Sequence, residues 1–165
     1  PQITTLMQLD SEPTSPVMIF NLNYRENPSF SAGGLQVKIL ENDQTRATST
    51  QRSSQLQTNN ETITWTQRLQ LSEGVLRFKV VTGRSTTWGN FGSDDDDDDS
   101  DHLAVALTTS HATLADYSPA VSVQNSGPGF GSNRVSSMTL LGVRYYQGNM
   151  LLSTDSTPRS VSLSN

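Results

Sequence analysis

Seven aspartates lie within eight residues, as the unbroken run Asp94 to Asp99 followed by Asp101. Carboxylates on a loop are the ligands that Ca²⁺ prefers, and the ion takes about six to eight oxygens. Consecutive residues of an extended chain point in opposite directions, so the whole run cannot converge on one ion. Two interpretations stay open. One is a calcium site on part of the run, with Asp94, Asp96, Asp98 and Asp101 as ligands, and the other is a solvated, self-repelling loop.

Three aromatic residues, Trp88, Phe91 and Phe130, lie in two glycine-rich segments. Exposed aromatic rings near Asn and Asp side chains can stack on sugar rings, so one hypothesis is a carbohydrate-binding surface. The competing interpretation is structural, because glycines let the backbone fold tightly over a buried aromatic ring at the end of a β-domain. The sequence favours the structural interpretation, since no further motif accompanies the aromatic residues.

The residues that could act as catalysts show no recognisable arrangement. The two histidines, His102 and His111, lie near no nucleophile motif such as G-x-S-x-G. A glycosidase needs two carboxylates across a cleft, whereas Glu61 and Glu73 fall at opposite ends of one expected strand. The chain contains no cysteine, which excludes disulfides, thiolate zinc sites and thiol catalysis. We therefore expect a protein that is not an enzyme and has no established cofactor, calcium being the one metal that the sequence suggests.

The charge and composition narrow the class of partner. The net charge is −5, and because the aspartate run contributes six negative charges, the rest of the chain sums to about +1. The eleven Lys and Arg residues are scattered singly, so no basic stripe for nucleic acid is present. No apolar run approaches the roughly 20 residues of a membrane span, and no signal peptide is visible. A polar chain with only 16% charged residues is typical of exported bacterial β-proteins, so we expect an extracellular or cell-surface location, with Asn60 in the sequon Asn-Glu-Thr as a candidate glycosylation site.

The stretch from Glu61 to Gly83 indicates how these residues are positioned. Apolar residues occupy every second position from Ile63 to Leu71 except Gln67, and again from Leu76 to Val80, with polar residues between them. This two-residue period is that of a strand with one buried face. The turn signal Ser-Glu-Gly separates the two runs, so the sequence predicts an antiparallel β-hairpin.

Shorter runs of the same kind occur along most of the chain. The polar segment Glu41 to Asn60 holds either a weak edge strand around Thr45 to Thr50 or a binding or packing loop. Arg134 to Tyr146 is the longest late strand, with a bend expected near Gly142. Roughly nine or ten short strands without a helical period predict an all-β fold, a two-sheet β-sandwich with jelly-roll topology.

The opening segment is expected to form an extended arm. Residues 1–16 contain a candidate strand and a connection with two prolines, Pro13 and Pro16, and residues 17–165 form the expected β-sandwich domain. Two interpretations stay open: the strand pairs with its own domain, or it completes a sheet in another copy by β-strand addition. The side chains of the donated face would be Ile3, Thr5, Met7 and Leu9.

These features together resemble two families of exported β-proteins. An apolar strand, a two-proline connection and a polar, cysteine-free body are similar to donor-strand assembled extracellular fibre subunits, although classical pilins often carry a disulfide. The late segment SSMTLLGVRYY, preceded by SNR, resembles a strand of jelly-roll carbohydrate-binding modules. The first resemblance implies a non-catalytic structural subunit that polymerises with copies of itself into a filament. The second implies the alternative, a carbohydrate-binding module that takes polysaccharide and has a loop calcium site.

Overall fold

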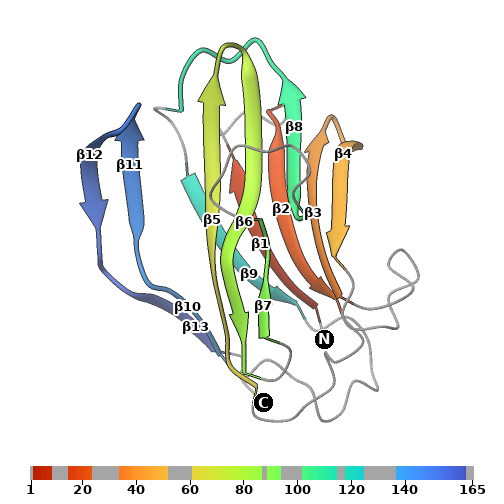
Figure 1. Ribbon diagram of the computed structural model, residues 1–165, viewed down its shortest axis with the longest axis vertical. Coiled ribbons are helices and arrows are strands. Elements are labelled where there is room, and N and C mark those ends of the chain that lie inside the picture. The colour runs from red at the N-terminus through yellow and green to blue at the C-terminus, as the bar shows by residue number, and fades with distance from the viewer. Residues whose placement is uncertain are drawn as a thin grey trace.

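The computed structural model describes residues 2–8, 15–23, 34–51, 61–86, 89–93, 102–114, 118–124 and 137–162. Within these ranges the chain is all β, without a helix, and its strands form several antiparallel sheets (Figure 1), which confirms the predicted fold class at this level. The strands are β1 (Gln2–Gln8), β2 (Val17–Asn23), β3 (Gly34–Glu41), β4 (Gln44–Gln51), β5 (Ile63–Ser72), β6 (Val75–Ser85), β7 (Gly89–Phe91), β8 (Ala104–Thr108), β9 (Ser118–Gln124), β10 (Ser137–Leu140), β11 (Val143–Gln147), β12 (Met150–Asp155) and β13 (Arg159–Ser162). None of the described residues belongs to a helix long and apolar enough to cross a membrane.

The first strand lies inside a five-stranded sheet with the order β4-β3-β2-β1-β9. It pairs with β2 on one side and with β9 on the other, so that Ile3 is opposite Leu22 and Val123. Met7 is buried in the core at 8% exposure. In this structure the opening strand therefore pairs with its own domain, which is one of the two interpretations left open by the sequence. Leu9 lies outside the described residues.

The polar segment after β3 contains β4, so the weak edge strand expected around Thr45 to Thr50 is confirmed. Asn42 and Asp43 connect β3 to β4 with φ angles of 52° and 59°. Two successive left-handed residues fit the tight turn that joins twisted antiparallel strands, and Asn and Asp tolerate this conformation better than most side chains. The turn thus allows a chain with few apolar residues to return along β3.

The predicted central hairpin is formed by β5 and β6. Its turn contains Glu73 and Gly74, both at positive φ, as a two-residue hairpin turn requires. The longer strand, β6, also pairs with β7 and β8, which gives a second sheet of four strands.

Side chains from the two larger sheets are buried in one cluster. The five-stranded sheet contributes residues such as Phe20 and Val37, and the four-stranded sheet contributes Phe78 and Val80, all at 0% exposure. The Phe20 ring meets Trp65 edge-on, with centroids 5.4 Å apart. This arrangement follows from the sequence pattern, because alternating residues of each strand face the shared interior.

The predicted long late strand is divided in the structure. Residues 137–140 form β10, which pairs with β13, while residues 143–147 form β11, which pairs with β12. The division falls at Gly142, where a Cβ atom would lie 2.9 Å from the carbonyl oxygen of Asp155. The close backbone approach at this glycine accounts for the bend expected there.

Candidate functional site

Most of the residues predicted to form sites lie outside the described part of the chain. This holds for Asn60, Trp88, Phe130 and the proposed calcium ligands Asp94, Asp96, Asp98 and Asp101. Within the described residues, no group of three or more His, Asp or Glu side chains is placed to hold a metal ion. The calcium and glycosylation hypotheses therefore stay predictions.

Phe91 is described, and it lies in the core instead of on the surface. Its exposure is 7%, and its ring stacks on Phe20 with centroids 6.5 Å apart. The ring also covers Gly83, its register partner on β6, where a Cβ atom would overlap the ring. Phe91 therefore takes the structural position that the sequence favours, and a ring that lies against Phe20 and covers Gly83 leaves little of its surface for sugar stacking.

An irregularity in β6 lies beside this aromatic ring. The register of β5 and β6 shifts between Thr64 and Thr66, so that one extra residue is accommodated in β6. Thr82 has a φ of 50°, which is unusual for a β-branched residue. Its hydroxyl lies 3.1 Å from that of Thr66. A bulge with a strained residue redirects the strand that follows, here Gly83 to Ser85.

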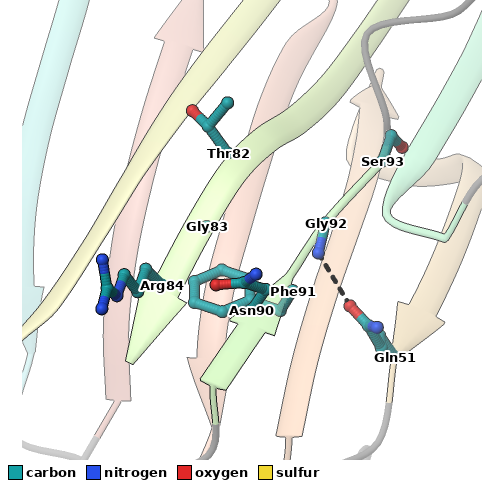
Figure 2. A pocket seen from close by; sticks show the side chains of 8 residues that line it. All are labelled: Gln51, Thr82, Gly83, Arg84, Asn90, Phe91, Gly92 and Ser93. Atoms are coloured by element: carbon teal, nitrogen blue, oxygen red, sulfur yellow. Dashed lines mark hydrogen bonds between the residues drawn. The ribbon is translucent and has the colours of Figure 1, made fainter. Parts of the chain in front are cut away.

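The bulge forms one wall of an open groove of about 440 Å³ (Figure 2). Arg84 and Asn90 are opposite each other on β6 and β7, and both side chains are exposed. The amide oxygen of Gln51 accepts a hydrogen bond of 3.0 Å from the backbone N–H of Gly92. The remaining lining residues are Thr82, Gly83, Phe91 and Ser93. The groove thus presents an exposed guanidinium and an exposed amide group.

The two residues that flank the acidic segment are tied to the body and to each other. The Ser93 hydroxyl donates a hydrogen bond of 2.6 Å to the His102 carbonyl oxygen, and the Ser93 N–H donates to the Val80 carbonyl oxygen at 2.8 Å. The Leu103 N–H donates to the Ser49 hydroxyl at 3.1 Å. Ser93, His102 and Leu103 are therefore fixed to one another and to strands β4 and β6.

The carboxylates considered for catalysis lie far apart along β5. Glu61 accepts a hydrogen bond from the Ser85 hydroxyl just before the strand begins, and Glu73 lies in the turn after it ends. This placement agrees with the sequence interpretation that the two glutamates do not face each other across a cleft.

A second surface feature is the hairpin of β11 and β12, shown at the left edge of the molecule in Figure 1. Among the described elements, the two strands make extensive contacts only with each other. All the large apolar side chains found exposed in the described part of the chain fall here or just before the hairpin. They are Leu141 at 70%, Tyr145 at 36%, Tyr146 at 56%, Met150 at 60%, Leu151 at 50% and Leu152 at 56% exposure.

The apolar side chains occupy both faces of this hairpin. Tyr146 is opposite Leu151 on one face, and Gln147 is opposite Met150 on the other. The sequence interpretation treated this region as ordinary late strands and missed the surface. The available signal was the pairing of adjacent apolar residues in Tyr145-Tyr146 and Leu151-Leu152, which a strand with one wet face does not require.

Comparisons with protein-family models, with curated proteins and with solved structures gave no match for this chain.

Proposed function

We propose that this chain is a non-catalytic structural subunit that associates with copies of itself into a filament, outside the cell or at its surface. The observation that carries the proposal is the β11–β12 hairpin, whose large apolar side chains are exposed on both faces. A cluster of exposed apolar side chains is a common mark of an interaction site.

The size of the apolar surface is consistent with a specific contact. The six side chains are exposed by 36–70%. Taking about 200 Å² for a large side chain, they present roughly 650 Å² of surface. A stable interface of ordinary size buries roughly 800 Å² on each partner, so a neighbour that covers both faces of the hairpin would bury most of that area.

The hairpin also gains order from such a contact. An isolated two-stranded hairpin is only marginally stable in water. The strands β11 and β12 have no third strand in their sheet among the described residues, and neither packs extensively on the larger sheets. Burial against a second molecule would therefore stabilise both the contact and the hairpin itself.

Donation of β1 between copies, the mode implied by the resemblance to fibre subunits, would take the form of an exchange. Both edges of β1 are paired along its length within its own sheet, to β2 and to β9. A neighbour could supply the same strand only if each copy released its own, as in domain swapping. The hairpin requires no such release, so we assign the contact between copies to β11 and β12.

The two larger sheets form the body of the molecule, from which the β11–β12 hairpin extends. The two larger sheets bury one shared cluster of side chains, which supports the β-sandwich that the sequence predicts. The extracellular location remains part of the proposal and depends on the polar, cysteine-free composition.

The test is a double substitution in the hairpin, Tyr146→Ser with Leu151→Ser. We expect the wild-type protein to sediment as a concentration-dependent series of polymers and to show filaments by electron microscopy. The double variant should associate at least tenfold more weakly, because hot-spot side chains dominate such contacts. Its melting temperature should change little, since both side chains are exposed.

A matched control places two serine substitutions on another exposed strand, Gln44→Ser with Arg46→Ser in β4. This control should associate like the wild type. A wild-type chain that sediments as a monomer at every attainable concentration would contradict the proposal.

Carbohydrate binding is a second candidate, favoured by the exposed pair Arg84 and Asn90 in the groove. Retention on polysaccharide gels in affinity electrophoresis should then be lost in Arg84→Ala with Asn90→Ala. If the aspartate run that follows the groove holds calcium, chelation should also lower the melting temperature. Unchanged retention and an unchanged melting temperature would remove this candidate.

A further inference from the structure

The outer face of the four-stranded sheet gathers cations that lie far apart in the sequence. The strands of this sheet, β5, β6, β7 and β8, contain three arginines and one lysine, and no aspartate or glutamate. In Figure 1, β5 and β6 lie in front of the five-stranded sheet, so their outer face is turned toward the viewer. The cations are Arg68 on β5 and Arg77, Lys79 and Arg84 on β6.

Two of the pairs between β5 and β6 place three of these cations close together. Arg68 is directly opposite Lys79, so both side chains leave the sheet on the same face. Gln70, two residues further along β5, is opposite Arg77, which therefore shares that face. Phe78, between the two cations of β6, points to the other face and is fully buried. The cations thus face away from the cluster that the two larger sheets share.

Arg84 lies on the same face beyond the bulge in β6. It is opposite Thr64, and Thr64 points the same way as Arg68 because the two are four residues apart in one strand. The partner of Arg77 is six positions beyond Thr64 on β5, which at about 3.4 Å per residue is roughly 20 Å. Charges at this spacing match a polymer with repeated anionic groups better than a single small anion.

The four cations differ in exposure. Lys79 is 9% exposed and, like Arg68, has an interaction within the chain. Arg77 and Arg84 are exposed and form no ion pair with the described residues. Their guanidinium groups are therefore available near the two ends of the face, and the exposed side chain of Arg68 lies between them.

The exposed side chains around the arginines are polar. Thr64, Thr66 and Gln70 are exposed on β5, and Asn90 on β7 is opposite Arg84 in the groove. Hydroxyl and amide groups can exchange hydrogen bonds with the hydroxyl groups of a sugar. None of the described side chains exposed on this face is aromatic or large and apolar. The face therefore lacks the platforms for base stacking that single-stranded nucleic acid uses and the apolar anchors that a membrane surface requires.

We propose that the outer face of β5 and β6 binds an acidic polysaccharide, with its carboxylates on Arg77, Arg68 and Arg84 and its chain extending into the groove beside Asn90. Arginine suits this role because its planar guanidinium binds a carboxylate through two parallel hydrogen bonds. The inference rests on the second candidate function, carbohydrate binding, and names the charge of the ligand. It does not depend on self-association through the hairpin.

The test is binding to immobilised polygalacturonate, which carries a carboxylate on each sugar residue, with dextran as the neutral polysaccharide. The parent protein carries Tyr146→Ser with Leu151→Ser, so that polymerisation does not multiply weak contacts. It should bind polygalacturonate at least about tenfold more tightly than dextran, and the difference should shrink as salt screens the charges.

In this parent, Arg77→Gln with Arg84→Gln should weaken binding to polygalacturonate at least about tenfold, because two charge-assisted contacts are lost. The matched control is Lys38→Gln with Arg46→Gln, which removes the same charge from β3 and β4. It should bind like the parent. Equal losses in the two double variants would mean that net charge alone decides, and would overturn the assignment to this face.

A second variant adds charge to the face instead of removing it. Thr64→Glu places a carboxylate opposite Arg84, where it competes with the ligand for the guanidinium, and should also weaken binding. Thr50→Glu adds the same charge on the exposed side of β4 and should bind like the parent. Both threonines are exposed, so melting curves close to that of the parent are expected.

The remaining outcomes separate the inference from the function on which it rests. Equal binding to dextran would overturn the acidic ligand while carbohydrate binding stands, and binding to neither polysaccharide would remove both. Tighter binding to a single-stranded oligothymidylate of equal charge would identify nucleic acid as the partner and overturn the inference. Binding that appears only after Asp→Asn substitutions throughout Asp94 to Asp99 would mean that the chain's own aspartates occupy the face, with the same consequence.

Discussion

The β5–β6 and β11–β12 hairpins are built alike but end in opposite environments. Both are antiparallel, and both turns contain a glycine at positive φ, Gly74 at 73° and Gly148 at 56°. In the first hairpin, Phe78 on β6 is fully buried, whereas in the second Tyr146 on β11 is 56% exposed. Local turn chemistry therefore determines that a hairpin forms, and the pattern of side chains on its faces determines where it packs.

The difference lies in how apolar residues are distributed between the two faces. Along β5 the residues alternate between half-buried and exposed, so one face has a clear direction of burial. Along β11 and β12 apolar residues occur on both faces, and no single orientation against the body covers them. Such a hairpin leaves apolar side chains exposed in the described part of the chain.

The largest predicted effect is the truncation of a buried ring in the body. Phe78→Ala should lower the free energy of unfolding by about 3–5 kcal/mol, because it removes a fully buried side chain and leaves a cavity in the shared cluster. Urea denaturation followed by fluorescence measures the change.

The matched substitution in the second hairpin is Tyr146→Ala. Because Tyr146 is 56% exposed and its strand makes extensive contacts only with β12 among the described elements, the free energy of unfolding should change by less than about 0.5 kcal/mol in dilute monomer. Equal losses in the two variants would show that the hairpin is part of the same cooperative core, and would contradict the distinction between the two regions.

The β5–β6 hairpin could be predicted from sequence because its period, its turn residues and its burial agree. The alternation from Ile63 to Leu71 identifies the strand, and Glu73-Gly74 identifies the turn. The placement of the opening strand could not be predicted in the same way. Its apolar face requires burial in a sheet, and the side-chain pattern is the same whether that sheet belongs to its own chain or to another.

The candidate sites were less predictable than the fold. Phe91 has the same glycine neighbours whether it covers Gly83 in the core or faces a ligand, and only the register with β6 decides between these positions. The groove around Arg84 and Asn90 depends on a bulge opposite Trp65, and a bulge has no distinct side-chain signature in this segment. Sequence patterns specify which residues are buried, and pairing between distant strands specifies what they meet.

A smaller effect than the cavity is expected where the Phe91 ring covers Gly83. Gly83→Ala should destabilise the body by about 1–3 kcal/mol, because the new methyl group overlaps a ring held against Phe20. The double variant with Phe91→Leu should lose less than the sum of the two single variants, since the smaller side chain makes room for the methyl group. Strict additivity in urea denaturation would contradict the contact.

The corresponding glycine of the exposed hairpin serves as the control. At Gly148 no atom lies within 4 Å of an added Cβ, so Gly148→Ala meets only the conformational cost of a positive φ. We expect faster amide exchange in β11 and β12 with an unchanged midpoint for the body, because local opening of the hairpin does not require the body to unfold.

The smallest predicted effect concerns the junction between β12 and β13. The pKa of Asp155 lies below its usual value of 3.8, chiefly because the Thr157 N–H donates to the carboxylate at 3.0 Å and also because the Arg159 guanidinium is bound to it. Because the pKa of Asp155 is lower in the folded state, its ionised carboxylate stabilises the folded junction. This stabilisation is complete at pH values above the usual pKa and is lost as the pH falls through the pKa of the folded state. Amide protection in β12 and β13 should decrease in that acidic range, before the body responds.

Substitutions can show which of the two groups, the Thr157 N–H or the Arg159 guanidinium, lowers the pKa of Asp155 more. Arg159→Gln should return the pKa of Asp155 only part of the way, because the Thr157 N–H still stabilises the carboxylate. Thr157→Pro removes that donor and the nearby hydroxyl together and should give the larger return. Titration of the Asp155 carboxyl carbon by NMR measures both shifts. A larger return in Arg159→Gln would mean that the ion pair, an exposed contact that salt screens readily, holds the junction in place of the backbone hydrogen bond.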